Sequence, residues 1–171
     1  MDVRRFPGSR RLPQFNKAEL ARSLTNAGIR YEHLVELGGR RPVRGDSHNL
    51  MWQNASFRGY ADYMETPPFL EGFDRLLKIA RDSRTAIMCS EVVWWRCHRS
   101  MIADDLKAKG TTVLHIMGPG KIQVHPYTSA ARLVNGRLSY RSPLLDPEPP
   151  LQENEPMMHT FKIRKTVRSK K

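Results

Sequence analysis

The chain has 171 residues and 39% of them are hydrophobic, which suits one domain with an ordinary core plus extensions. It contains no run near the roughly 20 apolar residues of a membrane helix and begins without an apolar signal segment, so we expect a cytoplasmic protein with no membrane partner. The 29 Lys and Arg face 17 Asp and Glu, and the resulting net charge of +12 favours an anionic partner such as a nucleotide or a nucleic acid.

Helix and strand signals alternate along the first 140 residues. Asn16 and Glu19 resemble a capping box, Gly28 is a helix stop, and prolines at 67 and 68 suit a first helical turn. In chain order we expect a helix over 16–28, a strand over 29–35, a long loop over 43–57, a helix near 60–65, a helix from Thr66, a strand over 85–89, a helix over about 95–109, a strand over 111–116, and weaker strands over 121–125 and 137–140.

The segment 85–116 decides the predicted fold class. A strand, a helix and a second strand within about 32 residues form a βαβ unit, which implies a parallel sheet with a right-handed crossover. We therefore predict a Rossmann-like, three-layer α/β domain over residues 1–142 with a mostly parallel sheet. Residues 143–171 are rich in proline and then basic, and we expect this tail to lack fixed structure.

The densest group of reactive side chains follows the predicted strand 85–89. Ligands bind at the carboxyl ends of strands in open α/β sheets, so Cys89, Glu91 and His98 are the candidate catalytic residues and Arg99 a candidate anion clamp. Packing is the alternative role for the cysteines and for His98. The segment matches no phosphate loop, phosphatase loop or dinucleotide turn.

A metal site is not predicted from this segment. Cys97 and His98 are adjacent, and adjacent residues of one helix point about 100° apart, which suits a single ion poorly. No other cofactor is predicted.

Further anion contacts are expected from basic or aromatic residues in other parts of the chain. Guanidinium groups bind phosphates well, and the arginines near the N-terminus lie in a loop broken by proline and glycine. A solvated basic loop, or packing in the case of the tyrosine, is the alternative for each. The candidates are Asp2, Arg4, Arg40, Arg58 and Tyr60.

Taken together, these residues resemble the domain of unknown function 488 family over about residues 1–125. The resemblance implies a Rossmann-like α/β sheet and no established reaction. Members usually carry one more strand and a helix before Asp2, so we expect either an upstream start or a sheet that is one strand short. The matching pieces are Asp2-Val3-Arg4 with Pro7, Ser9, Pro13 and Phe15; Tyr31 with His33-Leu34; Leu37-Gly38-Gly39-Arg40; residues 57–63; Cys89-x-Glu91; Cys97-His98-Arg99 with Ile102-Ala103; and His115-Ile116 leading to His125.

Two classes of function fit the sequence. One is an enzyme that acts on a nucleotide or nucleic acid by phosphate or glycosidic chemistry, with arginines holding the anion and Cys89 or Glu91 as nucleophile or base. The other is a non-catalytic module that binds nucleic acid or a nucleotide through the same basic surface. Carboxylate, thiol and imidazole together exceed what phosphate binding alone requires, which favours the enzyme.

Overall fold

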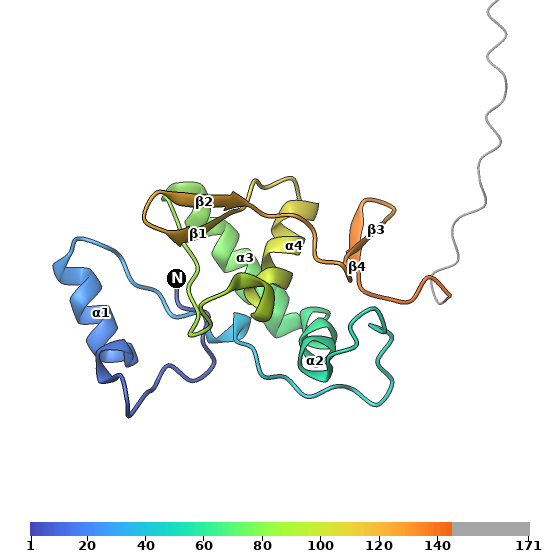
Figure 1. The fold of residues 1–171 in the computed structure, drawn as a ribbon, viewed down its shortest axis with the longest axis horizontal. Coiled ribbons are helices and arrows are strands. Elements are labelled where there is room, and N and C mark those ends of the chain that lie inside the picture. The colour runs from blue at the N-terminus through green and yellow to red at the C-terminus, as the bar shows by residue number, and fades with distance from the viewer. Residues whose placement is uncertain (145–171) are drawn as a thin grey trace, which may run out of the picture.

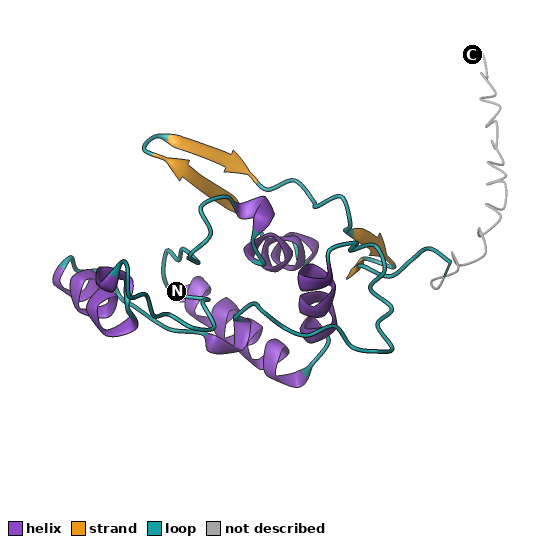
Figure 2. Ribbon diagram, turned by 60° about the horizontal axis from the view of Figure 1, so that its bottom comes forward, coloured by secondary structure: helices purple, strands orange, loops and turns teal. Residues whose placement is uncertain are grey.

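The computed structural model describes residues 1–144, in which helices form the body of the molecule (Figure 1). Helices α2, α3 and α4 pack together, whereas α1 stands to one side and two small hairpins lie on the other sides (Figures 1 and 2). In chain order the elements are η1 (Pro13–Phe15), α1 (Lys17–Asn26), η2 (Val35–Leu37), α2 (Ala55–Met64), α3 (Pro67–Asp82), η3 (Trp94–Arg96), α4 (Arg99–Ala108), β1 (Leu114–Gly118), β2 (Lys121–Val124), β3 (Arg132–Val134) and β4 (Arg137–Ser139).

The prediction of a mostly parallel Rossmann-like sheet is wrong. Both sheets of the described part are antiparallel two-stranded hairpins, β1–β2 and β3–β4. Parallel pairing is limited to single bridges, in which Asp2 lies between His33 and Met88. The expected strands over 29–35 and 85–89 are therefore too short to form a ladder.

The second strand of the predicted βαβ unit, over 111–116, does not join a parallel sheet, and the reason is local. Gly118 and Gly120 both have positive φ, and the turn between them returns the chain at once as β2. The segment 111–116 thus pairs with the next residues along the chain and not with 85–89. Ile116 and Ile122 are 74% and 64% exposed, so the apolar run is a surface hairpin and not a buried strand.

The apolar stripe of the helix that begins at Pro67 forms the centre of the core. Phe69, Phe73 and Leu76 of α3 are each at most 2% exposed and pack with residues of α2 and α4. The buried hydroxyl of Tyr60 in α2 donates to the Leu37 carbonyl at 2.8 Å, which ties α2 to the η2 turn. The sequence predicted this helix correctly because its spacing of apolar residues is regular over four turns.

A buried carboxylate joins the C-terminal hairpins to α4. Asp104 is fully buried and accepts hydrogen bonds from the Thr128 backbone and hydroxyl, from the Tyr140 hydroxyl and from His125 Nε2. His125 Nδ1 in turn lies 2.8 Å from His115 Nε2 on β1. These contacts add to the apolar packing of Ala130 and Tyr140 in the core.

The helix expected over 95–109 is interrupted at its start. The 3-10 turn η3 ends before Cys97, whose φ of −131° and ψ of 146° are extended, and α4 begins only at Arg99. Cys97 and His98 therefore lie at a junction and not on one helix. This break decides how their side chains are placed.

Gly59 offers a test of how α2 packs. A Cβ at this position would collide with the backbone of Arg41 and Pro42. We expect Gly59→Ala to push α2 away from the backbone of Arg41 and Pro42. The change should lower the free energy of unfolding by about 1–3 kcal/mol, the usual range for overpacking. Urea denaturation would measure the change. Gly45→Ala, which meets no atom within 4 Å, is the control, and equal effects of the two changes would contradict this packing.

The predicted domain boundary and tail fall at the edge of the described residues. Nearly all of the tail over 143–171 lies outside residues 1–144, so its predicted lack of structure stays a prediction. None of the helices within residues 1–144 combines the length and the apolar character needed to cross a bilayer.

Candidate active site

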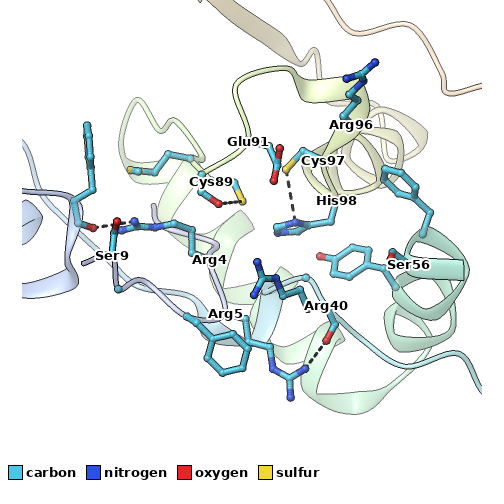
Figure 3. Close-up of a pocket in the computed structure, with 18 of the residues that line it drawn as sticks. Arg4, Arg5, Ser9, Arg40, Ser56, Cys89, Glu91, Arg96, Cys97 and His98 are labelled. Carbon is cyan, nitrogen blue, oxygen red and sulfur yellow. Dashed lines mark hydrogen bonds between the residues drawn. The ribbon is translucent and has the colours of Figure 1, made fainter. Parts of the chain in front are cut away.

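A cavity of about 730 Å³ separates the N-terminal loop from the helical body. Three separate parts of the chain contribute its walls: the loop before α1, the region from Gly39 to α2, and the segment from Met88 to His98. In Figure 3, Cys89, Glu91, Cys97 and His98 lie on one side of it, and Arg4, Arg5, Ser9 and Arg40 on the other. The predicted site residues that line it are Arg4, Arg40, Tyr60, Cys89, Glu91 and His98.

Asp2 lies beneath the cavity and holds Arg4 in its wall. Both residues are largely buried, and Arg4 Nη2 donates to Asp2 Oδ2 at 2.6 Å while Nη1 donates to the Phe15 carbonyl at 2.8 Å. The Tyr31 hydroxyl donates to the same carboxylate at 2.7 Å. Burial alone would raise the pKa of Asp2, but the hydrogen bonds from Arg4 and Tyr31 outweigh it and lower the pKa. Asp2 is thus a structural anion that fixes a cationic wall.

Arg40 is placed by an unusual backbone conformation. Its φ of 59° lies in the left-handed region, which costs energy for a residue other than glycine and is frequent at functional sites. The preceding Gly39 packs against the His98 ring, where a Cβ would come within 2.8 Å of Nδ1. Arg40 forms no ion pair with another residue among 1–144, and its exposed guanidinium is free to meet an anion.

The helix break at Cys97 brings two thiols and an imidazole together. Cys97 Sγ lies 3.7 Å from His98 Nδ1, and Cys89 Sγ lies within 4.8 Å of Cys97 Sγ and of a ring nitrogen of His98. His98 Nε2 lies 3.0 Å from the Val3 carbonyl oxygen, which can only accept a hydrogen bond. Nε2 therefore carries the proton, and in the neutral ring Nδ1 presents its lone pair to the sulfurs.

The two thiols differ in acidity. The hydrogen bond from Cys97, the nearby His98 ring and the hydrogen bond from the Glu91 backbone N–H lower the pKa of Cys89 far below its ordinary value, although burial opposes them. The hydrogen bond to Cys89 and burial raise the pKa of Cys97. A thiolate at Cys89 is the reactive form of cysteine, both as nucleophile and as metal ligand.

Besides Asp2, which lies beneath it, two predicted anion contacts do not line the cavity. Arg99 points behind it, where Nε donates to Cys97 Sγ at 3.3 Å and Nη2 donates to the Glu91 carbonyl. It thus positions the segment that carries Glu91. Arg58 donates to the Trp52 carbonyl at 2.9 Å within α2 and its preceding loop.

Sequence reasoning missed several residues of the cavity. Cys97 is not among the candidate catalytic residues of the sequence, and it is 2% exposed, but its sulfur lies beside Cys89 and His98. Arg5 and Arg96 add positive charge, and Ser9, Asn54, Ser56 and Phe57 complete the wall. The adjacent Cys97-His98 pair was the signal in the sequence for this cluster. It was set aside because adjacent residues of a continuous helix would point in different directions.

Residues 1–106 match the family described as Domain of unknown function DUF488, so the chain belongs to this family. The match spans every residue that lines the cavity. No curated protein and no solved structure matches the chain.

Proposed function

We propose that the protein is an enzyme acting on a phosphate-bearing substrate of nucleotide type in this cavity. The observation that supports it best is the composition of the two walls. Arginines that can hold an anion face a group of thiol, carboxylate and imidazole side chains that can carry out chemistry. A site for anion binding alone would need only the first wall.

Charge in the cavity favours an anion. Four arginines line it, Arg4, Arg5, Arg40 and Arg96, against the carboxylate of Glu91, and of the four only Arg4 is paired with a carboxylate, that of Asp2, among residues 1–144. Planar guanidinium groups form paired hydrogen bonds with phosphate oxygens, which are stronger than bonds between neutral groups. Neither Arg40 nor Arg96 forms an ion pair with any of residues 1–144, so both can bind a ligand without losing a protein partner.

Size and aromatic walls suit a nucleotide. Cavities for small ligands and cofactors usually measure roughly 300–1,000 Å³, and this one measures about 730 Å³. Phe6, Phe15, Phe57 and Tyr60 contribute to its lining. Stacking of a nucleobase on an aromatic side chain contributes about 1–3 kcal/mol of binding free energy per base.

Glu91 is the candidate acid or base. It lies in the segment between α3 and η3, is exposed to the cavity, and has its backbone carbonyl held by Arg99. A positioned carboxylate next to a bound phosphate or glycosidic bond can donate or accept a proton in the reaction. Cys89 supplies a thiolate within the same wall.

A nucleotide panel tests the proposal. We expect adenosine and guanosine mono-, di- and triphosphates to bind with different affinities in isothermal titration calorimetry, and at least one to be converted to a product seen by liquid chromatography and phosphorus NMR. Arg40→Gln should weaken the tightest binder about tenfold or more, since a hydrogen bond to a charged group contributes about 1.5–3 kcal/mol.

The matched control for Arg40 is Arg44→Gln. Arg44 lies four residues further along, is exposed, and pairs with Asp46 outside the cavity. Its loss should leave nucleotide affinity unchanged. Binding without any conversion would favour the non-catalytic alternative, and no binding of any nucleotide would contradict both.

A further inference from the structure

We infer that Cys89, Cys97 and His98 bind a thiophilic divalent cation, and that zinc is the cation they fit best. The inference goes beyond the proposed function, because metal binding is measurable without any substrate. The two Sγ atoms and a ring nitrogen of His98 all lie within 4.8 Å of one another, and Nδ1 is the nitrogen beside Cys97 Sγ. Among residues 1–144 no other group of cysteine, histidine and carboxylate atoms converges in this way.

The spacing of the ligand atoms is close to that of a tetrahedral zinc site. Zinc binds sulfur at about 2.3 Å and imidazole nitrogen at about 2.0 Å, which places tetrahedral ligand atoms about 3.5–3.8 Å apart. Cys97 Sγ and His98 Nδ1 are already 3.7 Å apart. From separations of up to 4.8 Å, the remaining pairs need to close by at most about 1.3 Å, which a rotation of the partly exposed Cys89 side chain can provide.

His98 is oriented as metal-binding histidines usually are. Such residues donate their second ring N–H to a carboxylate or a backbone carbonyl, which fixes the ring and its tautomer. Here Nε2 donates to the Val3 carbonyl at 3.0 Å, and Nδ1 is left as the ligand atom. Gly39 packs on the ring and permits no side chain at that place.

The Cys97 sulfur has N–H donors that stabilise its deprotonated form. The Arg99 backbone N–H and Nε donate to Cys97 Sγ at 3.5 and 3.3 Å. On binding, each thiol that still carries a proton releases it to solvent, and two thiolates with a neutral imidazole balance the charge of the cation.

Three protein ligands leave one coordination position of the cation open. Structural zinc has four protein ligands, whereas catalytic zinc has three and keeps a position for water or substrate. All three residues line the 730 Å³ cavity, so the open position faces it. Glu91 lies in the same wall outside the ligand group, where it can take a proton from zinc-bound water.

Metal titration of the reduced, full-length protein tests the inference. After treatment with a chelator, we expect the chain to bind one equivalent of zinc, and cobalt(II) to give thiolate charge-transfer absorption with the intense visible bands of a four-coordinate site. Cys89→Ser and His98→Gln should each weaken zinc binding at least about 100-fold, because loss of a ligand exceeds the roughly 10- to 100-fold effect of losing a ligand's hydrogen-bond partner.

His33→Gln is the matched control. His33 Nε2 also binds a carbonyl of the N-terminal segment, that of Arg4 at 2.8 Å, but His33 is outside the ligand group. It should keep wild-type zinc affinity, with circular dichroism showing that each variant is folded. Folded, reduced wild-type protein that binds no zinc would overturn the inference, and so would undiminished binding by Cys89→Ser. If the protein binds no zinc but still converts a nucleotide, the metal inference fails and the proposed function stands.

Discussion

Replacing Glu91 by glutamine is expected to lower turnover of the best nucleotide of the panel about 100-fold or more while nucleotide affinity changes little. Glutamine keeps the shape of the side chain and cannot donate or accept the proton, and general acid–base catalysis contributes roughly 10²–10⁴-fold. The affinity should persist because the arginines, and not Glu91, hold the anion. Single-turnover rates and calorimetry of the same preparations separate the two quantities.

Glu71→Gln is the control for Glu91. Glu71 is an exposed carboxylate on α3 that does not line the cavity, so its loss should leave both turnover and affinity unchanged. If Glu91→Gln turned over nucleotide at the wild-type rate, the carboxylate would have no part in the chemistry. A tighter complex with unchanged turnover would show only that one negative charge had been removed from the cavity.

Replacing Asp2 by asparagine is expected to lower the free energy of unfolding by about 3–5 kcal/mol. The change leaves the buried Arg4 guanidinium without its counter-charge, which is costlier than losing a surface pair. Thermal unfolding should shift downward by roughly 10 °C for a domain of this size. Because Arg4 lines the cavity, nucleotide affinity should fall in the same variant.

The matched control is Asp46→Asn. Asp46 also pairs with an arginine two residues away, Arg44, but both side chains are more than half exposed. Water screens such pairs, and their loss costs about 0–1 kcal/mol. If the two variants unfolded at the same temperature, the Asp2–Arg4 pair would not be buried as described.

The stability contributed by Asp2 should depend on pH in a defined direction. Its folded pKa lies below the unfolded value of about 3.9, so its contribution is complete above that value and is lost as the pH falls through the folded pKa. The difference in unfolding free energy between wild type and Asp2→Asn should therefore be constant from about pH 5 to pH 7 and shrink below about pH 4. Urea denaturation across this range measures it, and a difference that grows in acid would contradict the assignment.

The sequence by itself determined the long helices and the neighbourhood of the site. The apolar stripe of α3 and the helix stop at Gly28 are local signals, and both produced correct helices. Family membership likewise followed from short motifs, because Cys89-x-Glu91 and Cys97-His98-Arg99 keep their spacing whatever the fold around them. These features depend on residues close together in the chain.

Only the tertiary structure decided the sheet and the placement of the reactive groups. An apolar run such as 111–116 has the same sequence whether it pairs with a distant strand or with the next one, and here the turn at Gly118 and Gly120 selected the local partner. The break before Arg99 was equally hidden, because helix propensity continues through Cys97 and His98. Contacts of His98 with Val3 and Gly39, far away in sequence, hold the imidazole beside both thiols, and such long-range packing leaves no periodic signal in the chain.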